Sequence, residues 1–291
     1  MELIRLGERT YYIKNPTNVG VYKTGEDRVI LIDSGNDKDA GKKILKIMDG
    51  QGWKVEGIIN THSHTDHTGG NHVIAERTGC KIYSQGMEKA VIENTLLEPT
   101  YLYGSYPFKE LRNKFIMGKN SSADNVDGNL PEGLTTIMLK GHSFDMIGVK
   151  TSDGVCFLAD ALMSRETIEK YGVFYLYNVG EHLETLNALR NLEGSIFVPS
   201  HGEPVDNIQD LIGLNGEKIE EIRGKIFELC LQPKIFEDIL KELFDVYGIK
   251  MNTNQYVLIG STLKSYLSYM KEMGQATYDF VENRMVWRAL P

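Results

Sequence analysis

The feature that most constrains this chain is a cluster of histidines directly after a short apolar strand. The predicted strand at residues 55–62 runs into the sequence THSHTDHTGG at its C-terminal end, so that His62, His64, Asp66 and His67 fall within six residues of one another. A loop after a buried strand can direct alternate side chains toward one point. Imidazole and carboxylate groups are ligands of zinc and similar ions. The run therefore predicts a metal site, in which the first two histidines suit one ion and the next two residues suit a second.

Strands and helices alternate around this run, which predicts a layered α/β structure. Segments typical of strands lie at 10–14, 19–23, 28–35, 55–62 and 80–84, and helical segments lie at 39–52 and 69–79. Strand character returns at 135–143, 146–152 and 155–162, before a helix at 181–194 and a strand at 195–204. The intervening residues, about 85–131, combine aromatic residues with a polar run, and we interpret them as an insertion over a site rather than part of the sheet.

The pattern changes to three helices from about residue 213. They are expected at 217–230, 234–248 and 253–274, and a hairpin formed by 276–280 and 284–290 follows them. Three helices followed by a hairpin is the order of a winged helix. We therefore expect two domains, at 1–212 and 213–291.

The bulk properties narrow the class of protein. A formal net charge of −8 disfavours nonspecific attraction to nucleic acids or anionic membranes. No stretch approaches the roughly 20 apolar residues that cross a bilayer, and the charged N-terminus is not typical of a signal peptide. The three cysteines are far apart, which indicates neither a disulfide framework nor a thiolate zinc site. We expect a cytoplasmic protein with no membrane partner.

The histidine run resembles the HxHxDH motif of the metallo-β-lactamase superfamily. Four further motifs of that family follow in the same order at strand ends, with Asp33 in LIDSG, His142 in KGHS, Asp160 in FLAD and His201 in PSHGE. The resemblance covers roughly residues 1–212. It implies a four-layer αββα sandwich.

The resemblance also implies a site for two divalent metal ions. The first ion would be held by His62, His64 and His142, the second by Asp66, His67 and His201, with Asp160 between them. Asp33 would support the metal-binding loop without being a ligand. Zinc is the expected ion, and iron and manganese are alternatives because the same donors accept all three. A hydroxide bridging the ions is the implied nucleophile, and Asp66 can orient it.

The pairing of Asp66 with His67, and the lack of a cysteine beside Asp160, resemble the glyoxalase II-like and lactonase-like branch. We therefore expect an enzyme that hydrolyses an ester, thioester or lactone of a small molecule. Two alternatives stay open, namely metal-dependent phosphodiester hydrolysis on RNA, and a regulatory or redox metalloprotein that does not hydrolyse. A cluster of cations beside the metals would favour RNA, but the sequence offers only scattered ones, such as Lys109, Arg112, Lys114 and Arg165.

The insertion lies between two ligand motifs, so we expect it to form one wall of the substrate pocket, with Tyr101, Tyr103 or Phe108 facing inward. The C-terminal segment resembles the winged-helix appendage of some proteins of this superfamily. Its third helix has only Lys264 and Lys271 as cations. We therefore expect the appendage to brace or cover the active site, or to form a homodimer contact, rather than to read DNA.

Overall fold

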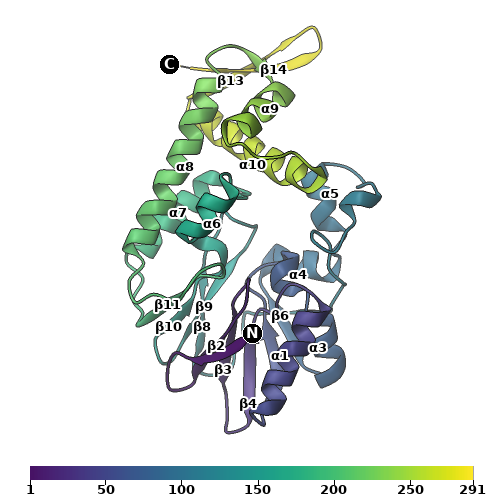
Figure 1. Cartoon of the computed structure of the whole chain (residues 1–291), viewed down its shortest axis with the longest axis vertical. Coiled ribbons are helices and arrows are strands. Elements are labelled where there is room, and N and C mark those ends of the chain that lie inside the picture. Colours follow the sequence, from purple (N-terminus) through teal and green to yellow (C-terminus); the bar gives the residue numbers. More distant parts are fainter. Residues whose placement is uncertain (291) are drawn as a thin grey trace.

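The computed structural model describes residues 1–290 and contains two large β-sheets that face each other (Figure 1). The first sheet has seven strands in sequence order. They are β1 (Glu2–Arg5), β2 (Thr10–Lys14), β3 (Val19–Lys23), β4 (Arg28–Ile32), β5 (Lys54–Ile59), β6 (Lys81–Ser84) and β7 (Asp124–Asn125). The strands from β1 to β4 pair antiparallel, whereas those from β4 to β7 pair parallel.

Helices connect the parallel strands of this first sheet and cover its outer face. They are α1 (Lys38–Gly50), the short α2 (Thr65–Thr68) and α3 (Asn71–Thr78). The side chain of Asp37 caps α1 by accepting from the backbone of Asp39 and Ala40, and α3 ends at Gly79 in the left-handed conformation that glycine adopts easily. Apolar residues of α1, such as Ile44 and Met48, are fully buried against the sheet.

The second sheet has four strands in the order β11-β10-β9-β8. Their bounds are β8 (Leu134–Met138), β9 (Ile147–Thr151), β10 (Val155–Phe157) and β11 (Ile196–Val198). Helices α6 (Arg165–Tyr171) and α7 (Val179–Leu189) lie on its outer side, and a 3₁₀ turn, η2 (Ala159–Ala161), follows β10. One apolar core lies between the two sheets and contains residues of both, among them Ile32, Ile59, Val149 and Phe157.

Helix, sheet, sheet and helix thus form four layers, which confirms the predicted fold class. Each layer follows from the sequence pattern, because the central strands are apolar on both faces and must be covered on both sides. Within residues 1–290, no helix is long and apolar enough to cross a membrane.

The segment expected as an insertion contains α4 (Gly86–Glu93), α5 (Leu97–Tyr103) and the 3₁₀ turn η1 (Lys109–Leu111). One part of the expectation was wrong, since residues 124–125 form β7 and extend the first sheet at its edge. Two residues of strand leave too little periodicity to be recognised in a polar run.

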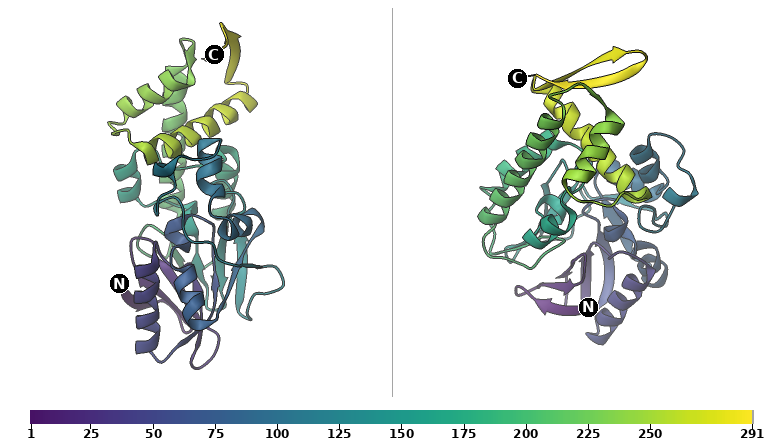
Figure 2. Two further views of the ribbon diagram at one scale, coloured as in Figure 1. Left: turned by 90° about the vertical axis from the view of Figure 1, so that its right-hand side faces the viewer. Right: turned by 45° about the horizontal axis from the view of Figure 1, so that its top comes forward.

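The C-terminal part begins with α8 (Gln209–Leu229) and continues with β12 (Lys234–Ile235), α9 (Phe236–Val246) and α10 (Thr253–Glu272). Strands β13 (Ala276–Val281) and β14 (Arg284–Ala289) form the expected hairpin, and β12 pairs with β14 on its other side. The hairpin lies at the opposite end of the molecule from β4 (Figure 2). The boundary expected between residues 212 and 213 lies inside α8, whose Ile212 and Ile219 belong to one continuous core.

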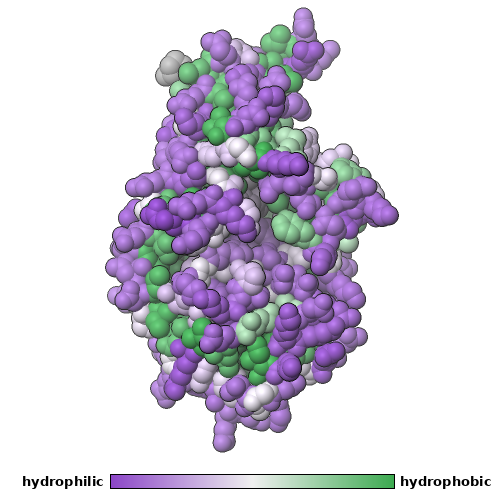
Figure 3. Space-filling view, in the orientation of Figure 1, coloured by the Kyte–Doolittle hydropathy of each residue, from purple (hydrophilic) through white to green (hydrophobic). Residues whose placement is uncertain are grey.

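Helix α10 packs across one end of the two-sheet sandwich, next to α7 and α5 (Figure 1). Its Ser265 Oγ accepts a hydrogen bond from the backbone N–H of Val179 at 3.1 Å, and its Thr262 Oγ1 accepts one from Leu176 at 3.3 Å. Its other end reaches the insertion, where Asn254 Oδ1 accepts from Asn113 Nδ2 at 3.0 Å. The surface is hollowed below α10 (Figure 3).

Candidate metal centre

The predicted ligands meet at one edge of the two sheets, on loops that follow strands. His62 lies three residues after β5, and Asp66 and His67 lie in α2 directly behind it. The second sheet contributes the remaining ligands, which follow β8, β10 and β11, and these are His142, Asp160 and His201. Loops at the carboxyl ends of neighbouring strands converge, so residues that are far apart in the sequence form one cluster.

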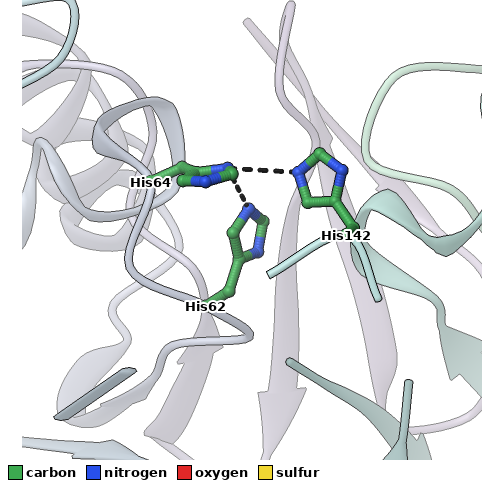
Figure 4. Close-up of side chains that lie close together, drawn as sticks. All are labelled: His62, His64 and His142. Carbon is green, nitrogen blue, oxygen red and sulfur yellow. Dashed lines mark hydrogen bonds between the residues drawn. The ribbon is translucent and has the colours of Figure 1, made fainter. Parts of the chain in front are cut away.

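The first group of ligands consists of His62, His64 and His142 (Figure 4). His64 Nδ1 lies 3.0 Å from His62 Nε2 and 3.1 Å from His142 Nε2, so three ring nitrogens face one point. Behind them, His142 Nδ1 lies 3.1 Å from the carbonyl oxygen of Tyr175, which fixes that ring.

The second group consists of Asp66, His67 and His201. His201 Nε2 lies 3.2 Å from Asp66 Oδ2, and His67 Nε2 lies 3.5 Å from the same oxygen. Asp66 is the more open carboxylate of the site, with 40% of its side chain exposed, compared with 7% for Asp160.

Asp160 lies between the two groups. Its Oδ1 is 3.3 Å from His67 Nε2, while its Oδ2 is 3.4 Å from both His142 Nε2 and His201 Nε2. A single carboxylate therefore contacts ligands of both groups, as expected of a bridging ligand.

The electrostatics of the two groups differ. Burial lowers the pKa of His64 to about 4 and that of His142 to about 3, which keeps both rings neutral, as metal ligands must be. Burial opposes protonation of His201 as well, but Asp160 and Asp66 outweigh it and raise the pKa of His201 to about 12. The carboxylates of Asp66, Asp160 and Asp33 outweigh burial at His67 too and raise its pKa well above the ordinary value, so a divalent cation at the second group would take the place of protons on these histidines.

Two buried atoms support this interpretation of the site as a metal centre. His67 Nε2 and Asp160 Oδ1 are both inaccessible to solvent, and although they lie 3.3 Å apart, neither forms a hydrogen bond of good geometry within residues 1–290. Buried polar atoms without partners are rare and costly. A cation between the two groups would satisfy both, so the residues present fit a metal ion.

Asp33 lies behind the metal-binding loop, as predicted. It is 2% exposed, and its carboxylate accepts hydrogen bonds from the backbone N–H and the hydroxyl of Thr61, both at 2.8 Å. Its Oδ2 also lies 2.7 Å from His67 Nδ1. Asp33 adopts a left-handed conformation with φ of 64°, which aspartate tolerates better than most residues.

The residue before Asp160 has an unusual backbone. Ala159 has φ of 50°, a region that L-residues other than glycine and asparagine avoid. It is buried at 2% exposure, and the turn it forms aims Asp160 at the histidines. Backbone strain of this kind collects at functional sites where the surrounding structure imposes it.

The three aromatic residues predicted for the pocket wall do not lie together in the structure. The Tyr101 ring packs on Phe144, with 5.0 Å between ring centroids, and Phe144 is two residues after the ligand His142. Tyr103 and Phe108 instead pack on each other and are 40% and 44% exposed, so their side chains lie at the surface.

Three residues near the site were missed by the sequence analysis. The Tyr175 ring lies 5.3 Å from that of His64 and 5.6 Å from that of His142. Glu88 and Glu98, on α4 and α5, are buried carboxylates at 0% and 6% exposure. An acidic residue on a short polar helix carries no sequence signal of burial.

The fold and the ligand cluster define a metallo-hydrolase type of protein. The family model of the metallo-beta-lactamase superfamily matches residues 13–201, which include every predicted ligand. The chain therefore belongs to the metallo-beta-lactamase superfamily, as the resemblance of its motifs predicts.

Individual relatives differ in how much of the chain they match. A hydroxyacylglutathione hydrolase of Rhodospirillum rubrum is 35% identical over 65 residues, which cover 20% of this chain and 25% of that protein. The probable metallo-hydrolase YqjP of Bacillus subtilis is 25% identical over 289 residues, covering 80% of this chain and 86% of YqjP. The chain spans about a quarter of the length of the hydroxyacylglutathione hydrolases that it matches.

Solved structures share the fold along the whole chain. A beta-lactamase domain protein from Burkholderia ambifaria superposes with a TM-score of 0.73 and 14% identity, covering 99% of this chain and 94% of that one. The likeness therefore includes the C-terminal helices and hairpin as well as the sandwich.

Proposed function

We propose that this protein is a dinuclear metal-dependent hydrolase that cleaves an ester, thioester or lactone of a small molecule. The position of Asp160 carries the proposal, because one carboxylate within 3.4 Å of ligands from both groups is what two adjacent ions require. When bound, two divalent ions supply Lewis acidity and lower the pKa of water. Zinc is the first ion to test, with iron and manganese as alternatives.

The chain's own residues have separate tasks in this proposal. His62, His64 and His142 are held neutral by burial and bind the first ion. Asp66 is a ligand of the second ion and also the most open carboxylate of the site. Its Oδ2 accepts from Thr17 at 3.0 Å and faces His201, so its other oxygen, Oδ1, is the one to accept a hydrogen bond from the attacking water.

Several observations favour a small acyl substrate. The wall beside the first group of ligands is aromatic, formed by Tyr101, Phe144 and Tyr175, and aromatic walls suit a small organic ligand. The name of the hydroxyacylglutathione hydrolases among the relatives makes thioesters the first class to test.

Phosphodiester hydrolysis is the second candidate, although the cations give it little support. Arg112 is hydrogen-bonded to Tyr106, and Lys114 lies 3.8 Å from Asp37. A groove of about 370 Å³ beside Thr65 has lysines but also Asp37 and Glu76 in its lining, so its charge is mixed.

The C-terminal residues 213–291 belong to a winged-helix appendage in this proposal, and Pro291 lies outside the described residues. Helix α10 braces the site, since its hydrogen bonds to Leu176 and Val179 hold the segment that presents Tyr175. Sedimentation of the full chain would show whether the appendage also forms a homodimer.

The decisive experiment measures metal content and activity together. Purified protein is expected to carry close to two transition-metal ions per chain. Asp66→Ala and His67→Ala should lose mainly one ion and most of the activity, whereas Asp39→Ala, an exposed aspartate on α1, should change neither. Thioesters, lactones, bis-p-nitrophenyl phosphate and single-stranded RNA are offered as substrates. One ion per chain, unaffected by these substitutions, would refute the dinuclear assignment.

A further inference from the structure

Glu98 is a buried carboxylate without a partner. It lies on α5, one residue before the buried Pro99, and is 6% exposed. Within residues 1–290 its carboxylate has no hydrogen-bond donor and no cation at ion-pair distance. The charges that act on it most strongly are the carboxylates of Asp66 and Glu88, which have the same sign. A buried carboxyl group in this state is costly to the fold unless a ligand pairs with it.

The helical spacing of α5 shows which way Glu98 faces. Tyr101 and Leu102 follow it by three and four residues, so the three side chains share one face of the helix. Leu102 and Tyr101 belong to an apolar cluster with Tyr175 and with Val257 of α10. This face of α5 therefore points toward the metal centre, where Tyr175 packs on the ligand histidines.

Tyr175 provides a second unsatisfied group at the same place. Its hydroxyl is inaccessible to solvent and, although the hydroxyls of Tyr101 and Ser261 lie near it, forms no hydrogen bond of good geometry among the described residues. Burial raises the pKa of Tyr175 above its usual range, and Tyr101 and Glu98 are among the groups that act on it. Two unsatisfied buried polar groups beside one catalytic centre indicate a subsite for a polar group of the substrate.

The chemistry of the subsite selects the kind of group. In its ionised form Glu98 accepts hydrogen bonds and attracts positive charge, so this form selects against an anion, and an apolar group would leave it unpaired. A primary ammonium has three donors and one positive charge, which match both the carboxyl group of Glu98 and the oxygen of Tyr175. The rings of Tyr101 and Phe144, 5.0 Å apart, provide the π faces that stabilise such a cation.

We propose that Glu98 and the hydroxyl of Tyr175 form a subsite that binds a primary ammonium group of the substrate's acyl part. The proposal rests on the proposed hydrolase function and names its substrate class, an aminoacyl ester or thioester. Burial and the charges of Asp66 and Glu88 raise the pKa of Glu98 well above its ordinary range in the free protein. A bound ammonium supplies the missing positive charge and returns the carboxyl group to its ionised form.

The test compares acyl groups that differ only in charge. N-acetylcysteamine thioesters of β-alanine and of butyrate differ by an ammonium in place of a methyl group, and those of 6-aminohexanoate and heptanoate form a longer pair. The wild-type protein should prefer the ammonium member of at least one pair in kcat/KM by about tenfold or more, the effect of one hydrogen bond to a charged group. Glu98→Gln should abolish that preference and leave the methyl members nearly unchanged. Glu110→Gln, an exposed carboxylate of the same segment, is the matched control.

A binding measurement separates this proposal from the proposed function. Calorimetry with the non-hydrolysable N-butyl amides of β-alanine and butyrate, and of the longer pair, should show the same preference for the ammonium member and its loss in Glu98→Gln. If neither thioester is hydrolysed but the amide preference is present, the hydrolase assignment fails and the subsite stands. If the wild type binds both amides of each pair equally, or if Glu98→Gln keeps the preference, the subsite is refuted.

Stability provides a further readout that a purely structural role would not give. Glu98→Leu removes an unpaired buried carboxyl group, so this variant is expected to melt at a higher temperature than the wild type while losing the ammonium preference. A lower melting temperature would show that Glu98 stabilises the fold and would contradict the assignment of the subsite.

Discussion

The carboxylate Oδ2 of Asp33 lies 2.7 Å from Nδ1 of His67, and both side chains are almost completely buried. The contact fixes the ring of His67 so that Nδ1 faces the sheet and Nε2 faces Asp160 and Asp66. A residue outside the two candidate ligand groups thereby determines which nitrogen of His67 faces the carboxylates of the second group.

Asp33→Asn is expected to weaken binding of the second ion. The amide cannot accept from Thr61 and His67 with both of its polar atoms, so the ring of His67 loses its orientation. Affinity for that ion should fall about tenfold to a hundredfold, while the first ion stays bound. Competition with a chromophoric chelator measures both affinities, and Asp39→Asn is the control. Equal losses at both ions would contradict this role.

Glu88 joins the two loops that carry the first group of ligands. Its Oε2 accepts from the backbone N–H of Ser63 at 2.9 Å, and its Oε1 accepts from that of Asp145 at 3.0 Å. Glu88→Gln places an amide N–H against one of these donors and should cost about 1–3 kcal/mol of stability. Affinity for the first ion should fall more than that for the second. Glu169→Gln, exposed on α6, should change neither the melting temperature nor metal binding.

Asp153 connects the two sheets through a pH-dependent contact. It accepts hydrogen bonds from the backbone of Arg9 at 2.8 Å and from the hydroxyl of Thr151 at 2.6 Å. Burial opposes the charged form, but hydrogen bonds from Thr10 and Thr151 outweigh it and hold the pKa of Asp153 below its ordinary value of 3.8. The stabilisation is therefore complete at neutral pH and is lost as the pH falls through the lowered pKa.

Asp153→Asn should accordingly lower the free energy of unfolding by about 1–3 kcal/mol at pH 7 and by clearly less at pH 3. Urea unfolding of metal-depleted protein at the two pH values measures the difference without interference from the ions. Asp49→Asn, exposed at the end of α1, should show no such dependence. A penalty that is the same at both pH values would mean that the charge of Asp153 is not involved.

The full-length protein is expected not to bind duplex DNA through its C-terminal part. The two cations of α10 are already engaged with aromatic rings, since Lys264 lies 5.2 Å from the ring centroid of Phe236 and Lys271 lies 5.2 Å from that of Tyr278. Few free charges remain to contact phosphates. A mobility-shift titration at low salt tests this, and binding at micromolar concentration or tighter would overturn it.

The sequence predicts that these residues cluster because they lie in loops that follow strands, where loops converge; that they bind metal stays a prediction. Three histidines of the first loop and Asp66 even fall within six consecutive residues. The bend at Ala159 could not be predicted from the sequence, because its left-handed backbone is imposed by the buried turn around it.

The walls of the pocket were harder to predict. Tyr101, Tyr103 and Phe108 look equivalent in sequence, yet only Tyr101 faces the apolar cluster, because two residues turn a helix by about 200° and place Tyr103 on the opposite face of α5, while Phe108 lies beyond the end of that helix. The start of α8 was missed because Gly213 and Gly216 weaken the helical pattern. Buried apolar residues on both sides of these glycines keep the helix continuous from Gln209.

The division of the ligands between the two sheets has a mechanical consequence. His62, His64, Asp66 and His67 belong to the half of the sandwich built on the first sheet, and the other three ligands belong to the half built on the second. Any ion bound to both sets would cross-link the two halves, much as a covalent bond does, but the link could form only after the halves have packed together. Removal of the ion would allow the two halves to separate at the edge that carries the ligand loops, while the apolar core between the sheets still holds the rest of the sandwich together. The chelated protein should therefore melt at a lower temperature and exchange the amide hydrogens of the loops after β5 and β10 sooner than those of the strands themselves.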